Sequence, residues 1–258
     1  MKSGMITTSR SSPPAEMVRN AGARRVHSVE LRGPAGRLEA VVNEGSSHAP
    51  FAALVCHPHP LGGGGLHNKV VYHAMKVLNA PEWGFHGPVL RFNFRGTGRS
   101  EGEHDGAAEA GDVVAALRWL ENEYKMPVVA AGFSFGAAMM LAACCGDGVA
   151  SRHAADVKAL IAIGLPVRSG AAPEQAPLYD YSFLAHCGIP KLFLSGDHDQ
   201  YATQTELIQA AAAAAEPKHL ALVPGADHFF TGRLEAMQSA LSSWLKERVY
   251  DPGQRPRI

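Results

Sequence analysis

Along the chain, apolar runs of strand length alternate with apolar positions at helical spacing. This alternation predicts the order of strands and helices. Short apolar runs of strand length recur at eight places, which are Val26–Leu31, Leu38–Asn43, Ala52–Cys56, Val89–Phe94, Val128–Ala131, Ala159–Ile163, Lys191–Ser195 and His219–Val223. The later runs are almost continuously apolar, which is typical of strands covered by helices on both faces. Helical spacing occupies the gaps between them, at Val70–Leu78, Val113–Leu120, Ala202–Ala215 and Leu234–Leu245.

The first two strand-like runs have no helix between them, and repeated βα units follow from the third. This order predicts an α/β fold with a mostly parallel sheet and an antiparallel edge. We expect one domain over residues 25–250, with a flexible leader at 1–24 and a tail at 251–258. The irregular stretch Leu165–Ile189 is too short for a large cap domain, so we expect a small helix and a loop beside a pocket there.

Composition excludes several classes of partner. Of 258 residues, 46% are hydrophobic and 19% charged, with 24 Lys and Arg against 24 Asp and Glu. A net charge of zero provides no broad basic field for nucleic acid or an anionic membrane. No apolar run approaches the roughly 18 residues of a membrane span. The leader is polar and lacks an apolar signal core, which favours a cytoplasmic protein, with a transit peptide as the alternative.

The four cysteines are Cys56, Cys144, Cys145 and Cys187, and their spacing matches neither a zinc site nor a small disulfide scaffold. Cys144 and Cys145 are adjacent in a predicted helix, so their side chains diverge. We expect four buried free thiols, as in a protein of a reducing compartment.

The most informative motif is Gly132-Phe133-Ser134-Phe135-Gly136, a G-x-S-x-G pentapeptide. Five letters alone are a weak signal, but this pentapeptide follows an apolar strand and precedes an Ala- and Met-rich helical run. That context is what a nucleophile elbow requires, and small residues two positions before and after the serine let the chain turn sharply. The alternative for Ser134 is a plain helix N-cap.

A serine hydroxyl attacks only when a base removes its proton, and the base needs a third group to orient it. Asp199 and His228 each lie just past the end of a predicted parallel strand, where open α/β sheets place their sites. The order Ser134, Asp199, His228 is the order that elbow-type hydrolases use. Asp197 is the competing acid; Asp199 could instead cap the next helix, and His228 could be a surface histidine.

A tetrahedral intermediate also needs N–H donors. The backbone N–H of Phe135, directly after the serine, is the expected first donor. The second should come from the loop His57–Gly65, in which Pro58 and Pro60 have no N–H, so His59 and Leu61 are the candidates.

Other interpretations of these residues stay open. His57, His59, Asp197, Asp199 and His228 could imitate a metal cluster, although their spacing matches no known metal motif. A binding module without activity is a further alternative. The Gly-punctuated turn Arg91–Ser100 is predicted to brace the site loops rather than to act in catalysis.

Taken together, the segments HPHPLGGG, RFNFRGTGRSEG, GFSFG, SGDHD and GADHFF resemble the α/β-hydrolase superfamily, over about Val26 to Val249. They are most similar to its small, capless branch related to dienelactone hydrolase. The resemblance implies an eight-stranded sheet and an acyl-transfer site with no metal and no cofactor. It also implies Ser134 as nucleophile, His228 as base, Asp199 as its partner, and Phe135 and His59 as the oxyanion N–H donors.

Dienelactone hydrolase carries cysteine at the elbow, whereas this chain has serine. We therefore expect a serine carboxylesterase that cleaves short-chain esters through an acyl-enzyme. A thioesterase, amidase, peptidase or dienelactone-type hydrolase would use the same residues. The expected partner is a small-molecule ester, not nucleic acid or a membrane, and a homodimer is left open. Phe133 and Phe135 flank the serine, and one of them is expected to wall the acyl site.

Overall fold

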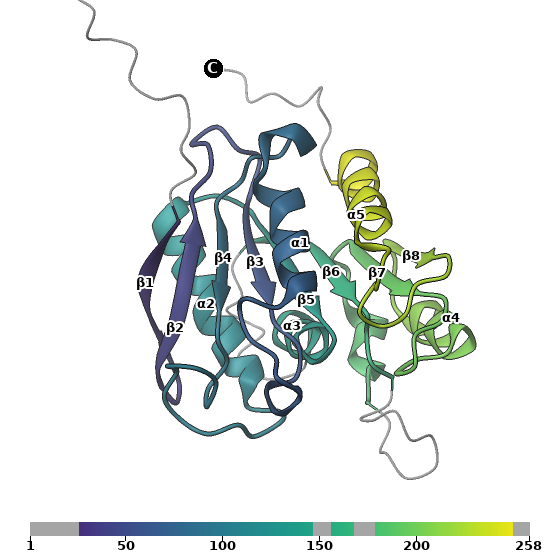
Figure 1. Cartoon of the computed structure of the whole chain (residues 1–258), viewed down its shortest axis with the longest axis horizontal. Coiled ribbons are helices and arrows are strands. Elements are labelled where there is room, and N and C mark those ends of the chain that lie inside the picture. Colours follow the sequence, from purple (N-terminus) through teal and green to yellow (C-terminus); the bar gives the residue numbers. More distant parts are fainter. Residues whose placement is uncertain (1–25, 147–155, 168–178, 250–258) are drawn as a thin grey trace, which may run out of the picture.

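The computed structural model describes residues 26–146, 156–167 and 179–249, which form one eight-stranded sheet with helices on both faces (Figure 1). The strands are β1 Val26–Gly33, β2 Gly36–Asn43, β3 Ala52–Cys56, β4 Val89–Phe92, β5 Val128–Phe133, β6 Val157–Ile163, β7 Lys191–Gly196 and β8 Lys218–Val223. The α-helices are α1 Lys69–Asn79, α2 Glu109–Tyr124, α3 Phe135–Cys145, α4 Gln204–Ala213 and α5 Leu234–Arg248. Short 3₁₀ turns are η1 Pro60–Gly62, η2 Pro81–Trp83 and η4 Ser182–His186.

The sheet has the order β1-β2-β4-β3-β5-β6-β7-β8. β1 and β2 are antiparallel to each other, and β2 is antiparallel to β4. The six strands from β4 to β8 run parallel, with β5 between β3 and β6. This arrangement confirms the predicted parallel sheet with an antiparallel edge, and it brings the ends of β3, β5, β7 and β8 to one edge.

Two apolar layers enclose the sheet. α1 and α5 pack on one face, where their apolar positions meet inward residues such as Val55, Val129 and Leu194. α2, α3 and α4 cover the other face, against Leu54 and Phe193 among others. The parallel strands β3 and β5 are buried along their whole length because both faces are covered, as their continuous apolar runs predicted.

Several element boundaries differ by one or two residues from those expected, and three of the differences have a clear local cause. β5 continues two residues further, to Phe133, because Gly132 and Phe133 still pair with β6. β4 stops at Phe92, after which the side chain of Asn93 bonds the N–H of Leu66 and the carboxylate of Glu39 on β2. α4 begins two residues later, at Gln204, because Thr203 and Glu206 form a capping box at its start.

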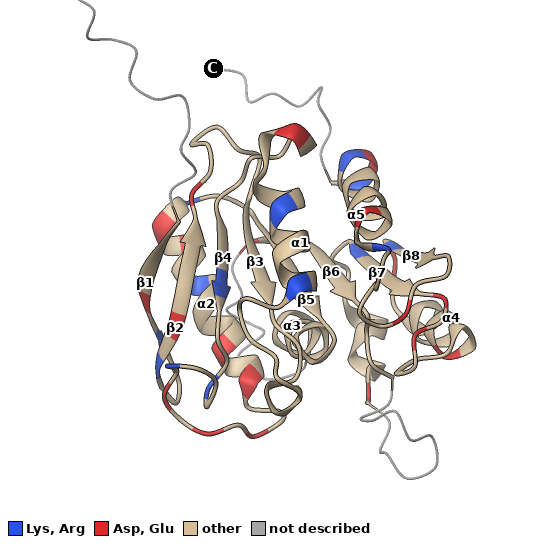
Figure 2. Cartoon of the chain, in the orientation of Figure 1, with Lys and Arg blue, Asp and Glu red and all other residues tan. Residues whose placement is uncertain are grey.

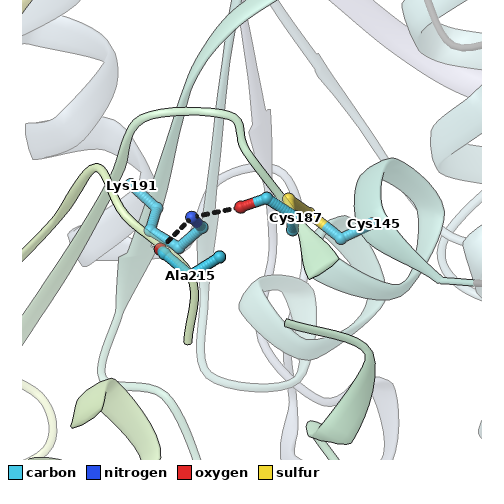
Figure 3. The surroundings of a disulfide bond; sticks show 4 residues. All are labelled: Cys145, Cys187, Lys191 and Ala215. Carbon is cyan, nitrogen blue, oxygen red and sulfur yellow. Dashed lines mark hydrogen bonds between the residues drawn. A yellow bond between two sulfur atoms is a disulfide. The ribbon is translucent and has the colours of Figure 1, made fainter. Parts of the chain in front are cut away.

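The expectation of four free thiols is wrong for two of them. Cys145, at the end of α3, forms a disulfide with Cys187, just after η4, across a sequence separation of 42 (Figure 3). The return of the chain through β6 brings these distant residues together, which no local spacing reveals. Cys56 and Cys144 are free and buried, and burial raises the pKa of Cys144 to about 12.

The disulfide is anchored by a neighbouring buried lysine. Lys191 Nζ donates to the backbone oxygens of Cys187, at 2.7 Å, and Ala215, at 2.9 Å (Figure 3). Because disulfides persist mainly in oxidising compartments, this one counts against the cytoplasmic location, which stays a prediction. By the loop-closure model, a crosslink of this span stabilises the fold by about 4 kcal/mol.

Charge is distributed as the composition suggested. Figure 2 shows basic and acidic positions interspersed over the described ribbons. Within those residues, no helix is both long and apolar enough to cross a bilayer. The predicted leader at 1–24 and tail at 251–258 lie outside the described residues, and so does the middle of the stretch Leu165–Ile189. The described part of that stretch contains the short helix η4, which packs against α3 and α4.

Candidate active site

Ser134 sits at the sharp turn between β5 and α3. Its backbone has φ 55° and ψ −123°, a conformation that L-residues rarely adopt and that stores strain. The flanking glycines make the turn possible. A Cβ at Gly132 would collide with the backbone of Gly136, and a Cβ at Gly136 would collide with the carbonyl oxygen of His57. The predicted need for small residues at both positions is therefore confirmed.

The structure brings the three predicted side chains together. His228 Nε2 lies 2.9 Å from Ser134 Oγ, and His228 Nδ1 lies 3.0 and 2.9 Å from the two carboxylate oxygens of Asp199. All three residues are buried, with only 9% of Ser134 and 2% of His228 exposed. Ser134 makes no side-chain cap to α3, and His228 is not on the surface, so neither alternative placement is observed.

Two further donors fix the carboxylate of Asp199. Ser195 Oγ, at the end of β7, donates to Oδ2 at 2.9 Å, and the backbone N–H of Tyr201 donates to Oδ1 at 2.8 Å. Asp197, the competing acid, instead accepts the N–H of Gly225 at 2.7 Å. The structure therefore places Asp199, and not Asp197, against the imidazole.

Aromatic rings surround the imidazole on what we call the base side, which comprises Phe133, Tyr201, His228 and Phe229. The ring centroid of Tyr201 lies 4.4 Å from that of His228, and Phe133 lies at 5.0 Å. Phe229 meets the imidazole edge to face, at 5.1 Å and 88°. These rings line the space around the imidazole, while Asp199 and Ser134 bond its two nitrogens.

Two unused N–H groups face the other side of the elbow. Over the described residues, we find no hydrogen bond for the backbone N–H of Phe135 or of His59. Phe135 is the first residue of α3, where N–H groups have no partner within the helix and the helix dipole favours negative charge. The N–H of Leu61 is already bonded to His59 Nδ1, at 3.2 Å, and its side chain is 81% exposed. Of the two candidates for second donor, His59 is thus the one with a free N–H.

A second cluster of rings lies on what we call the oxyanion side, which comprises His57, His59, Phe94, His104 and Phe135. The ring of Phe135 contacts those of His59, at 5.0 Å, and His104, at 5.5 Å. His104 Nδ1 lies 2.6 Å from the fully buried carboxylate of Glu109, which also accepts two backbone N–H groups. Phe133 and Phe135 are therefore both buried, and they pack in opposite directions from Ser134.

His57 is a structural histidine beneath the oxyanion side. The N–H of Phe94 donates to His57 Nε2 at 3.0 Å, so Nδ1 carries the proton and donates to the oxygen of Pro58 at 2.6 Å. Burial, reinforced by His104 and His59, lowers the pKa of His57 to about 4 despite the hydrogen bond to Pro58. Burial and His104 also lower the pKa of His59. Both pKa shifts favour the uncharged imidazole.

The turn after β4 braces the loops, as predicted. Arg91 on β4 donates to the carbonyl oxygen of Leu66 at 3.0 Å, and this bond holds the residue that follows the loop His57–Gly65 against β4. Arg95 forms a two-pronged ion pair with Asp112, at 3.0 and 2.7 Å, on α2. Ser100 Oγ donates to the oxygen of Asn93 at 2.7 Å. The partners in all these bonds are structural groups and not Ser134, Asp199 or His228, as expected for a bracing role.

The metal interpretation finds no support in the geometry. Both ring nitrogens of His57 are occupied, and Asp197 turns away from His228. Within the described residues, no group of three or more His, Cys, Asp or Glu side chains is arranged to hold a metal ion.

Sequence reasoning missed Ser195 and Tyr201, which both bond Asp199, and the buried role of His57. Ser195 and Tyr201 lie four residues before and two residues after Asp199. A polar residue at the end of an apolar strand, as at Ser195, is the signal that could have identified a partner.

Comparison with known proteins supplies the family. A family model described as an alpha/beta hydrolase domain matches residues 62–248. An uncharacterized protein of Rickettsia prowazekii is 35% identical over 227 residues, which cover 84% of this chain and 87% of that protein.

Two solved structures are similar in both fold and sequence. An α/β serine hydrolase homologue from Coxiella burnetii has 30% identity and a TM-score of 0.70, covering 85% of this chain and 97% of its own. A member of the α/β serine hydrolases without a lid, from Xanthomonas campestris, has 27% identity and a TM-score of 0.71, covering 91% and 100%. With its elbow serine, parallel sheet and matching domain, the chain belongs to the α/β-hydrolase family.

Proposed function

We propose that the chain is a serine carboxylesterase that hydrolyses short-chain esters through an acyl-enzyme. The observation that carries this proposal is the buried chain of contacts from Ser134 Oγ through His228 to Asp199, at 2.9 to 3.0 Å. A hydrolase family and a serine held against an oriented imidazole both support nucleophilic catalysis.

The reaction has two halves. His228 Nε2 takes the proton as Ser134 Oγ attacks the ester carbonyl, and Asp199 stabilises the imidazolium. The N–H groups of Phe135 and His59 hold the oxyanion, assisted by the positive end of α3. His228 then gives its proton to the leaving alcohol. Water, activated by the same imidazole, releases the acid from Ser134 in the second half.

One feature favours small acyl groups. The described chain has no large cap over the elbow, and the similar Xanthomonas structure is described as lacking a lid. Phe133 and Phe135, one of which was expected to wall the acyl site, are both buried in their own clusters. We expect acyl chains of two to roughly six carbons, and a p-nitrophenyl ester series with its maximum at about twelve carbons would contradict this.

Replacement of the nucleophile tests the proposal most directly. Ser134→Ala should lower kcat about 10⁴- to 10⁶-fold, because no covalent intermediate can form. Steady-state hydrolysis of p-nitrophenyl acetate measures the loss, and circular dichroism of the variant checks the fold. Substantial activity retained in a folded Ser134→Ala protein would reject the proposal.

Thioesters, amides and peptides pass through the same type of intermediate, so the triad does not separate them. A screen over acyl length and leaving group, with Ser134→Ala as the blank, distinguishes these substrates. Labelling of Ser134 by a fluorophosphonate probe, unaffected by a metal chelator, separates the serine mechanism from metal hydrolysis and from a module that only binds.

A further inference from the structure

We propose that Phe229 contacts the leaving alcohol of the substrate, so that esters of aromatic alcohols are preferred over those of saturated alcohols of the same size. The inference rests on the proposed function and adds to it the class of alcohol. It begins from an unusual exposure: Phe229 is 47% exposed, although it directly follows the buried His228.

The chemistry fixes where the leaving oxygen lies. When the tetrahedral intermediate collapses, the C–O bond to the alcohol breaks and His228 Nε2 gives its proton to that oxygen. The leaving oxygen must therefore come within hydrogen-bond distance of Nε2, which already lies 2.9 Å from Ser134 Oγ. The group attached to that oxygen is then next to the base side.

The rings on either side of Ser134 separate the two ends of the substrate. Phe135 packs with His59 and His104, beside the free N–H groups that would bind the oxyanion. Phe133 packs with His228 at 5.0 Å and with Phe229 at 6.1 Å. The oxyanion would thus lie beside Phe135, and the leaving alcohol would lie beside Phe133 and Phe229.

Phe229 is held firmly in its exposed position. Asp227 Oδ1 accepts the N–H of Phe229 at 3.0 Å and that of Thr231 at 2.9 Å. The next residue, Phe230, has a φ of 55° and is completely buried in the core. The ring of Phe230 therefore anchors the loop in the core, while the ring of Phe229 is exposed. A ligand would contact Phe229 without first having to order the loop.

The geometry of the cluster favours an aromatic ligand. Phe229 meets His228 at 88° and Phe133 at 73°, which are edge-to-face arrangements. A further aromatic ring can extend this packing, and such a pair changes an equilibrium or rate about 2- to 10-fold beyond simple burial of area. A saturated ring of equal size gains the buried area alone.

The test compares benzyl acetate with cyclohexylmethyl acetate, whose alcohols are both primary and carry six-membered rings. We expect the wild-type kcat/KM for the benzyl ester to be about 2- to 10-fold higher. Phe229→Leu should bring the ratio of the two kcat/KM values close to one, whereas Phe229→Tyr, which keeps the ring, should preserve it.

Tyr72→Leu is the matched control, since Tyr72 is an aromatic residue of α1 with nearly the same exposure, 46%. The ratio of the two kcat/KM values in this variant should equal that of the wild type.

A second measurement separates contact with the alcohol from damage to His228. Both esters give the same acetyl-enzyme, so its hydrolysis does not involve the alcohol. Burst kinetics with p-nitrophenyl acetate should show an unchanged deacylation rate in Phe229→Leu. Slower deacylation, an unchanged ratio, or an effect that follows the acyl chain instead of the alcohol would each overturn the inference.

Fluorophosphonate labelling distinguishes failure of the inference from failure of the proposed function. A protein that labels at Ser134 and forms an acetyl-enzyme but shows no aromatic preference contradicts the role of Phe229 alone. A protein whose Ser134 is not labelled overturns both.

Discussion

The two sides of Ser134 contain similar residues, but we propose different roles for them. Each contains histidine and aromatic rings, and each lies beside the same elbow. On the base side the proposed reactive groups are the imidazole of His228 and the carboxylate of Asp199, which lie 2.9 to 3.0 Å apart. On the oxyanion side the proposed donors are the backbone N–H groups of His59 and Phe135, and the histidine rings are structural supports.

This difference predicts how each side responds to mutation. Where a side chain performs the chemistry, even an isosteric replacement is damaging. Where the backbone performs it, the side chain can be removed, and only loss of the N–H is severe. Two sets of variants test this contrast, and a third experiment tests the structural role of His57 on the oxyanion side.

The largest effect is expected on the base side, from Asp199→Asn. The amide keeps the shape but can no longer stabilise the imidazolium or hold the proton on Nδ1, so kcat/KM should fall about 10³- to 10⁴-fold. Asp197→Asn is the matched control, because Asp197 bonds the N–H of Gly225 and not His228. Steady-state ester hydrolysis measures both. Equal losses in the two variants would mean that the partner of the base is misassigned.

On the oxyanion side the expected effect is smaller and depends on the backbone. His59 has a φ of −53°, which proline can adopt, so His59→Pro removes the N–H without forcing the chain into a new conformation. We expect kcat to fall about 10²- to 10³-fold. His59→Ala removes the ring but keeps the N–H and should lose far less.

Leu61→Pro completes this comparison. Its N–H is bonded to His59 Nδ1, so the variant should stay much more active than His59→Pro. Rates of acylation by p-nitrophenyl acetate measure all three variants. If Leu61→Pro were the most impaired, Leu61 would be the donor and His59 would not.

The smallest effect is on stability, through His57. Its folded pKa of about 4 lies below the ordinary value of 6.5, so between these values the unfolded chain binds more protons than the folded one. Stability is therefore fully present above about pH 6.5 and falls as the pH is lowered toward 4. From pH 7 to pH 5 this group alone should cost on the order of 2 kcal/mol, about a 30-fold change in the folding equilibrium.

Denaturant unfolding at the two pH values measures this loss. His57→Gln removes the titrating group, so the free energy of unfolding should depend less on pH in that variant than in the wild type. Parallel pH dependences in the two proteins would show that His57 does not carry this effect.

The sequence predicted most of the sheet, because its central parallel strands are almost continuous apolar runs, as expected for a sheet covered on both faces. It also placed Ser134, Asp199 and His228 at strand ends, and these ends converge because the strands are parallel. It could not supply Tyr201 or Phe133 as neighbours of His228, since ring contacts depend on how the loops after β5, β7 and β8 fold over one another.

The disulfide was the main error, and the second N–H donor was left open. The disulfide between Cys145 and Cys187 joins residues whose sequence separation of 42 contains no sign of their proximity. The choice between His59 and Leu61 depended on a local hydrogen bond from the Leu61 N–H to the His59 ring. The spacing of apolar residues locates helices and strands, but it does not show which backbone N–H groups in the turns are already hydrogen-bonded.

The disulfide also means that the polypeptide is a closed covalent ring between Cys145 and Cys187, and this ring includes β6. A protease that cut the chain once inside the ring would leave both pieces attached to each other. Such a nicked molecule would migrate as one band on a denaturing gel without a thiol reagent and as two bands with one.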